Sequence, residues 1–294
     1  MTQKIVYLLG AQKAGSTTLF YWVSQHPKIS GPKSMKDYPF FVFKDPFKKG
    51  MEWFKSQFNL KPNIDYILHG YVGYLYFTQR FIDNITDKNC KGKYLVVLRN
   101  PVDRAYSNYY YQKWRGMDKC ENFNSSIKYE HENIKKFSDP ELGSLTHIDH
   151  GYYSKQLSVL FNALGRENFY IILTEDLKEK DKLTKNIFEW LELTNVEINF
   201  SKENSSKVIK FYWTNLIIKK IKKIVPDFVK NRFSHSLKYK IKNKLQNIVS
   251  ENKKYKPLSN SENKSIYLKY YKNEINDLEK LLNRDLSKWK YYDS

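Results

Sequence analysis

The chain is poor in the residues that build disulfide scaffolds, flexible linkers and membrane spans. Its 294 residues include only two cysteines, Cys90 and Cys120, so we expect no disulfide framework and a reducing, cytoplasmic setting. No apolar run is long enough to cross a bilayer, and the first residues lack the basic, apolar and small-residue order of a signal peptide. Neither internal repeats nor stretches rich in glycine, serine and proline divide the chain. The sequence therefore predicts one domain with a sizeable core.

Aromatic and basic residues, in contrast, are abundant. The 24 tyrosines, 18 phenylalanines and 6 tryptophans argue against disorder, which requires a shortage of such side chains. The formal net charge of +20 indicates anionic partners, such as nucleotides, nucleic acid, acidic glycans or lipid headgroups. Drift in a solvated surface would produce the same excess, so the charge narrows the choice of partner without making it.

Apolar runs and helical patterns alternate over the first 200 residues. The apolar runs lack the polar alternation of half-exposed strands, which is typical of strands covered on both faces, and they lie at 5–9, 94–98 and 169–173, with a shorter candidate at 66–68. Helical patterns lie at 17–25, from Pro101 onward, at 153–164 and at 182–193. Strands joined by helices pair in parallel through crossover connections, so the pattern predicts a three-layer α/β fold.

After about residue 205 the strand signal fades. The rest of the chain has the pattern of basic, amphipathic helices, and Ser259 with Glu262 forms a capping box for the last long one. We therefore expect a single domain with an α/β core over 1–200 and a mainly helical C-terminal lobe over 205–294. The basic segment 210–233 is interpreted as a helix packed on the core, with contact to an anionic membrane or to an acidic polysaccharide acceptor as the alternatives.

The stretch GAQKAGST at residues 10–17 is a candidate anion-binding loop between a strand and a helix. Converging backbone N–H groups and the helix dipole favour an oxyanion there, while Lys13 adds a full charge. A plain strand–helix turn is the alternative, but the lysine and the hydroxyl run after Gly15 favour an anion site. A loop for a nucleoside triphosphate would place its lysine directly before the serine or threonine, and Lys13 comes too early.

A second motif, YLVVLRNPVDRAYSNYY, begins with the strand at 94–98. That strand ends in Arg99, whereas a triphosphate site usually has an acid there to hold magnesium. Ser107 follows eight residues later, about two turns into the next helix. Two separated phosphate sites without a metal ligand suggest a ligand that is phosphorylated at both ends.

These two motifs resemble the 5′-phosphosulfate loop and the 3′-phosphate segment of sulfotransferases. The closer resemblance is to the carbohydrate-type branch, which includes the sulfotransferase domains of heparan sulfate enzymes and bacterial polysaccharide enzymes. Further similar stretches are KDYPFF (36–41), HGYYSKQL (150–157), TEDL (174–177) and DLSKW (285–289). The resemblance covers nearly the whole chain, is weakest over 205–250, and implies a P-loop-like fold.

The resemblance implies the donor 3′-phosphoadenosine 5′-phosphosulfate (PAPS) and a site for it without a metal. Lys13 would stabilise the negative charge that grows on the leaving phosphate, and Arg99 with Ser107 would hold the 3′-phosphate. The expected donor contacts are Gln12, Lys13, Ala14, Gly15, Ser16, Thr17, Thr18, Arg99 and Ser107, with Lys254, Tyr255 and Lys256 as weaker candidates in a basic segment.

The resemblance also implies a catalytic base that takes the proton of the acceptor, which we expect to be a hydroxyl, with an amino group as the alternative. The family branch has a Lys-Glu pair followed by His-Phe-Phe, and here Lys36 and Asp37 stand at the pair while Pro39 replaces the histidine. We expect Asp37 to be the base. A second catalytic lysine cannot be assigned in HGYVGYLYF (69–77), so Lys36 is expected to supply the extra positive charge.

Several aromatic and histidine residues have two interpretations. Tyr71, Tyr74 and Tyr76 would suit stacking on sugar rings but are more often core residues. His69 is a conceivable base, and His26 at a helix end is expected to be structural. His147, Asp149 and His150 lie close together in the sequence, as metal ligands often do, but the sequence shows no further cluster of ligand residues.

Two other functions stay open beside sulfuryl transfer. A non-catalytic basic module for nucleic acid or membrane could retain a degenerate phosphate loop, although an intact set of Lys13, Asp37, Arg99 and Ser107 argues against it. A P-loop kinase is disfavoured by the position of the lysine and the missing magnesium acid. Expected partners are a carbohydrate or glycolipid acceptor and, peripherally, an anionic membrane, but no specific nucleic acid.

Overall fold

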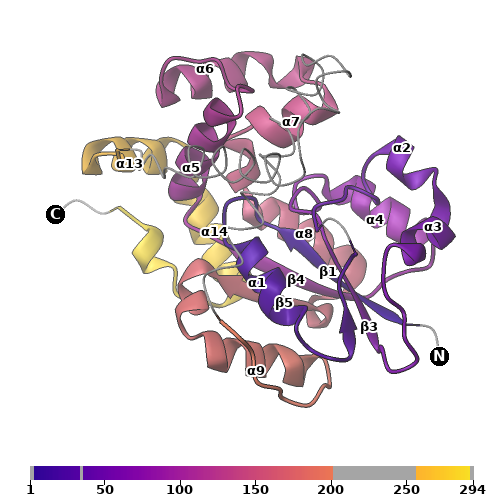
Figure 1. The fold of residues 1–294 in the computed structure, drawn as a ribbon. Helices are drawn as coiled ribbons and strands as arrows, with labels where there is room; N and C mark the ends of the chain where they lie inside the picture. Colours follow the sequence, from indigo (N-terminus) through magenta and orange to yellow (C-terminus); the bar gives the residue numbers. More distant parts are fainter. Residues whose placement is uncertain (1–2, 34–35, 201–255, 292–294) are drawn as a thin grey trace, which may run out of the picture. The chain divides into compact units, whose positions relative to one another are not determined.

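The computed structural model describes residues 3–33, 36–200 and 256–291 (Figure 1). The chain divides into two compact units, Met1–Asn199 with Pro257–Ser294, and Phe200–Lys256. The described helices and strands all belong to the first unit. The expected domain boundary near residue 205 and the basic segment 210–233 lie outside the described residues.

Five parallel strands form one sheet with the order β2-β3-β1-β4-β5. The strands are β1 (Lys4–Gly10), β2 (Ile29–Ser30), β3 (Tyr66–Gly70), β4 (Lys93–Leu98) and β5 (Phe169–Leu173). β1 is central, and its Leu8 lies between Gly70 of β3 and Leu95 of β4. The predicted α/β fold with a central parallel sheet is confirmed.

Helices flank this sheet on both faces (Figure 1). In the described ranges the α-helices are α1 (Ser16–Val23), α2 (Lys44–Phe47), α3 (Gly50–Ser56), α4 (Thr78–Asp87), α5 (Pro101–Trp114), α6 (Phe123–Asn133), α7 (Asp139–Leu145), α8 (Tyr153–Leu164), α9 (Lys180–Trp190), α13 (Asn260–Ile266) and α14 (Lys272–Leu282). α8 contacts both α4 and α14. The segment after α1 contacts α9, where the His26 ring lies 4.7 Å from that of Phe188.

The interior of the sheet explains much of the aromatic content. Val6, Tyr7, Leu8 and Leu9 of β1 have no exposed surface. The ring of Tyr7 stacks on Tyr94 of β4 at 5.6 Å, and its hydroxyl donates to the Cys90 carbonyl at 2.7 Å. Burying rings of this size provides much of the hydrophobic stabilisation of the domain, because each removes a large apolar area from water.

α5 starts where the sequence predicts it, directly after the strand β4. Pro101 occupies the first turn, where a missing N–H leaves no hydrogen bond unmade, and the side chain of Asn100 accepts from the Val102 amide at 3.0 Å. The side-chain Nδ2 of Asn100 donates to the Trp289 carbonyl at 3.4 Å. The turn between β4 and α5 is therefore held both by its own cap and by a segment nearly 190 residues further on.

Residues 284–289, which include the motif DLSKW, bind to the motif TEDL that directly follows β5. The Arg284 guanidinium makes two hydrogen bonds to the Asp176 carboxylate, at 2.9 and 3.0 Å. The buried indole of Trp289 donates to Glu175 at 2.9 Å. Paired Arg–carboxylate bonds fix geometry as well as adding energy. Residues 284–289 therefore act as a strap, the name used below, across the edge that carries Arg99.

Candidate active site

The candidate site lies where the carboxyl ends of β1, β3 and β4 meet at one edge of the sheet. In open parallel sheets ligands bind at this edge, in the crevice where the connections depart in opposite directions. The order of the strands puts the crevice beside β1, because the chain leaves β1 toward β2 on one side and β4 toward β5 on the other. The predicted phosphate loop, Asp37 and Arg99 all follow or adjoin these three strands.

The loop after β1 has the backbone geometry of an anion cradle. Gly15 has φ 97° at the start of α1, and a β-carbon there would lie 2.6 Å from the Leu177 side chain. No side chain caps the helix, so the amides of its first turn are left for solvent or a bound anion. The Thr174 hydroxyl lies 3.2 Å from the Ala14 carbonyl and 2.9 Å from that of Leu98, and so ties the loop to β4 and β5.

Lys13 supplies the only full charge within this loop. Its Nζ lies 4.2 Å from the centre of the Tyr111 ring on α5. Burial, followed by the nearby Arg99 guanidinium, lowers the pKa of Lys13 to about 8. Arg99 itself donates from Nη1 to the Lys13 carbonyl at 3.2 Å. The structure thus brings together the two predicted phosphate-binding cations.

Ser107 stands on the buried face of α5, two turns after Arg99. It is 8% exposed, and within the described residues its hydroxyl has no hydrogen-bond partner. An accessible hydroxyl that the protein leaves unused is available to an incoming ligand. The predicted spacing of Arg99 and Ser107 is therefore present as one strand–helix unit.

Lys36 and Asp37 adjoin the same loop from the other side. The Lys36 ammonium lies 3.0 Å from Asp37 Oδ1 and 3.5 Å from the Ser16 hydroxyl in the first turn of α1. The lysine side chain is 9% exposed whereas the aspartate is 44% exposed. Asp37 also pairs with Gly70 as an isolated parallel bridge at the end of β3. The candidate base is thus presented to solvent at the edge of the phosphate loop.

Two contacts of the site were not predicted from the sequence. Part of the expected site lies outside the described residues. Tyr111 beneath Lys13 and Thr174 behind the loop belong to segments distant in sequence. The signal for Tyr111 was its position four residues after Ser107, which places both on one face of a helix. Lys254 and Tyr255 lie outside the described residues, and Lys256 is the first residue of the range that follows them.

His69 does not have the properties of a catalytic base. It is 2% exposed, and its Nε2 lies 2.7 Å from the hydroxyl of the fully buried Tyr74. Burial, followed by the charge of Lys36, lowers the pKa of His69 to about 3. The core interpretation therefore holds for Tyr74, and His69, named above as a conceivable base, is a buried partner of it. His26 is structural as expected, since its Nε2 lies 2.9 Å from the Thr194 carbonyl.

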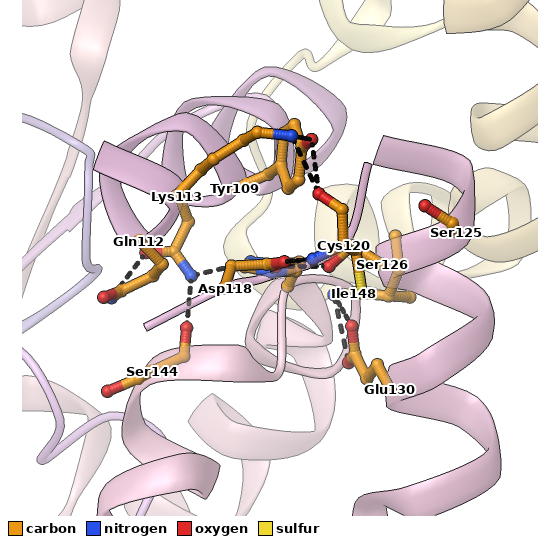
Figure 2. Close-up of polar contacts among 12 residues, drawn as sticks. Tyr109, Gln112, Lys113, Asp118, Cys120, Ser125, Ser126, Glu130, Ser144 and Ile148 are labelled. Carbon is orange, nitrogen blue, oxygen red and sulfur yellow. Dashed lines mark hydrogen bonds and ion pairs between the residues drawn. The ribbon is translucent and has the colours of Figure 1, made fainter. Parts of the chain in front are cut away.

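The histidines of the segment THIDHGYY form a structural network. His147 is fully buried, with Nε2 2.9 Å from Asp118 Oδ2 and Nδ1 2.9 Å from the Asn108 side chain. Figure 2 shows Asp118 and Ser126 meeting in this network, and the Ser126 hydroxyl donates to Asp118 at 2.5 Å. The His150 ring stacks on Tyr76 at 3.8 Å. Among the residues that the structure describes, no His, Cys, Asp and Glu side chains group as a metal site.

The same network contacts α5, which carries Ser107, the predicted phosphate-site serine. The Lys113 ammonium contacts the Tyr109 hydroxyl and the Cys120 carbonyl, both at 2.8 Å (Figure 2). The buried carboxylate of Glu130 accepts the Ile148 amide (Figure 2). Tyr109 and Lys113 therefore tie α5 to the segment that follows it.

Comparison with known proteins assigns the class. The model of the sulfotransferase domain family matches residues 3–277, so the chain belongs to the sulfotransferase domain family and is an enzyme of that class. A solved structure of a sulfotransferase from Alicyclobacillus acidocaldarius shares the fold, with a TM-score of 0.63, 20% identity, and coverage of 98% of this chain and 99% of that chain.

The curated relatives are larger proteins. Bifunctional heparan sulfate N-deacetylase/N-sulfotransferase 4 of Mus musculus is 23% identical over 285 residues, which are 94% of this chain and 30% of the relative. Bifunctional heparan sulfate N-deacetylase/N-sulfotransferase 1 of Homo sapiens is 27% identical over 238 residues, or 71% of this chain and 24% of the relative. The chain spans less than a third of the length of these relatives.

No helix in the described part of the chain combines the length and the apolar character needed to cross a bilayer.

Proposed function

We propose that this sulfotransferase moves the sulfuryl group of PAPS to a hydroxyl group of a carbohydrate. The observation that supports this most directly is the meeting of the loop lysine, Arg99 and the Lys36–Asp37 pair at one edge of the sheet. A donor phosphorylated at both ends of its adenosine matches two cationic groups, Lys13 in the loop and Arg99 at the end of β4. Heparan sulfate, in the names of the relatives, supports a carbohydrate acceptor, and the word N-sulfotransferase in the same names makes an amino group the second candidate acceptor.

The donor would lie along the loop and the start of α5. The amides of residues 13–18 and the hydroxyls of Ser16, Thr17 and Thr18 would hold the 5′-phosphate. Arg99 would grip the 3′-phosphate through its planar guanidinium, and the unused hydroxyl of Ser107 would add a hydrogen bond. Gln12, Ala14 and Gly15 complete the loop. Lys254, Tyr255 and Lys256 stay candidates for further contacts to the 3′-phosphate.

The reaction is an in-line displacement at sulfur. Asp37 would accept the proton of the acceptor hydroxyl as its oxygen forms a bond to sulfur. The bond between sulfur and the bridging oxygen breaks, and its electron pair stays on the 5′-phosphate. Lys13 would stabilise that charge, which is larger in the transition state than in the bound donor. Lys36, 3.0 Å from Asp37, would hold the carboxylate beside the loop.

The proposal is tested by binding and by transfer. We expect the purified protein to bind adenosine 3′,5′-bisphosphate without magnesium, and to transfer labelled sulfate from PAPS to members of a panel of oligosaccharides and glycolipids. Magnesium-dependent binding of ATP with no affinity for the bisphosphate would overturn it. Salt-sensitive binding to DNA or to anionic liposomes, again without nucleotide affinity, would instead indicate a basic binding module.

The lowered pKa of Lys13 predicts an alkaline limit to activity. The ammonium is the form that stabilises the leaving phosphate, so kcat/KM for PAPS should fall as the pH rises through about 8 and should be level below it. The alkaline limb, that is the fall in rate at high pH, should lie at higher pH in kcat than in kcat/KM, because the phosphates of the bound donor favour the charged lysine. Initial rates from pH 6 to 10 measure both profiles.

A matched variant separates this lysine from other titrating groups. Lys13→Arg keeps a positive charge that does not titrate in this range. Its residual kcat/KM should show no limb near pH 8, whereas the same limb in both proteins would assign the titration to another residue.

A further inference from the structure

The ammonium of Lys13 has an unusual set of neighbours. It is shielded from solvent enough for burial to lower its pKa, yet no carboxylate of the described residues lies within ion-pair distance of it. Among the described residues, the charge that acts on it is the Arg99 guanidinium at the end of β4, and Arg115, directly after α5, lies over the same Tyr111 ring. Asp103, in the first turn of α5, interacts with Arg99 instead.

One side chain supplies an attractive contact for this ammonium. Lys13 Nζ lies 4.2 Å from the centre of the Tyr111 ring, within the range at which a cation is attracted to an aromatic face. Tyr111 follows Ser107 by one helical turn on α5, so the ring and the serine share a face of the helix. The contact therefore places the loop lysine one turn from the predicted 3′-phosphate site.

We propose that the ring of Tyr111 is the seat of the Lys13 ammonium when no donor is bound, and that Tyr111 is thereby a positioning residue for sulfuryl transfer. The inference deepens the proposed function and rests on it for the catalytic role of Lys13. Tyr111 acts through Lys13; it holds the ammonium beside the loop, in its charged form, before the donor arrives.

An aromatic seat suits an anion-binding site better than a carboxylate would. A carboxylate would hold the lysine more strongly, but its negative charge would repel both phosphates of the donor. The attraction of a ring to a cation is weaker than an ion pair with phosphate, so the ammonium can leave the ring when the donor binds. Arg115, 5.5 Å from the same ring, adds positive charge and no competing acceptor.

The first test follows the titration of Lys13 without any catalysis. The pH dependence of reductive methylation at Lys13, with formaldehyde and cyanoborohydride and readout by mass spectrometry, gives its inflection directly. We expect wild type and Tyr111→Phe to share an inflection near pH 8. In Tyr111→Leu and Tyr111→Met it should move to lower pH by about half a unit or more, because the ring favours the charged form.

The second test follows the reaction. Relative to wild type, kcat/KM for PAPS should fall about tenfold in Tyr111→Leu and less than about twofold in Tyr111→Phe. The alkaline limb should move down in the leucine variant alone. Tyr110→Leu is the matched control, since Tyr110 packs on Tyr106 and Tyr109 and should leave the limb in place.

The outcomes separate this inference from the proposed function. The proposed contact between Lys13 and Tyr111 is refuted if Tyr111→Leu and Tyr111→Met unfold at the wild-type temperature and their methylation inflection at Lys13 is not shifted. The same holds if their kcat/KM for PAPS equals that of wild type. If wild type neither binds adenosine 3′,5′-bisphosphate nor transfers sulfate, the proposed function fails, while the methylation arm still decides whether the ring holds the lysine.

Discussion

Replacing Lys13 with alanine is expected to lower kcat for sulfuryl transfer by about a thousandfold. Removing one preorganised group that meets developing charge costs an enzyme about 10²–10³ in rate, and Lys13 is the one cation inside the loop. The affinity for adenosine 3′,5′-bisphosphate should change far less, because loop amides, Arg99 and Ser107 remain. Single-turnover rates with PAPS and calorimetric titration with the bisphosphate measure the two quantities.

A surface lysine provides the control for this variant. Lys28 is about half exposed and pairs with Asp65 away from the site, so Lys28→Ala should retain the wild-type rate. A loss of bisphosphate affinity as large as the loss of rate would show that Lys13 acts in ground-state binding. A kcat within threefold of wild type would remove it from the mechanism.

Replacing Asp37 with asparagine is expected to lower kcat by about 10²–10⁴, the usual contribution of a positioned general base. Asparagine keeps the shape and the pairing of this position with Gly70 but cannot accept the proton of the acceptor. Donor affinity should be unchanged, since Asp37 does not line the phosphate loop. Steady-state kinetics with saturating PAPS and a sulfated-product assay measure the loss.

Two further variants define the role of that carboxylate. Asp37→Glu restores a carboxylate at a position where the resembling enzymes carry glutamate, and it should recover most of the rate. Asp45→Asn removes an exposed carboxylate of α2 and should have no effect. If asparagine at position 37 supports the full rate, the proton is accepted by another group.

The strands and the phosphate loop could be predicted because their signals are local. Apolar runs marked β4 and β5 almost to the residue, and the glycines marked the loop after β1. β2 was missed because two residues, Ile29–Ser30, are too short to show a pattern. α7 was also missed, although its capping box of Ser138 and Glu141 was a readable start signal.

The candidate site was predictable only in part, because sequence shows residue types and not tertiary contacts. Arg99 and Ser107 share one strand–helix unit, so their spacing was visible. The ring of Tyr111 meets Lys13 from almost a hundred residues away, and no local pattern carries such a contact. Tyr74 is of a residue type that stacks on sugar rings, but neighbouring side chains bury it completely.

The strap of residues 284–289 has a consequence for how the enzyme is made. During synthesis, β4 and its Arg99 leave the ribosome long before Arg284 and Trp289, which secure Asp176, Glu175 and the Asn100 turn. The site proposed for the donor therefore lacks these contacts in a nascent chain without this stretch, even after the whole sheet has emerged. A ribosome-bound intermediate stalled near residue 280 should hold a formed sheet but lack the completed site proposed for the donor.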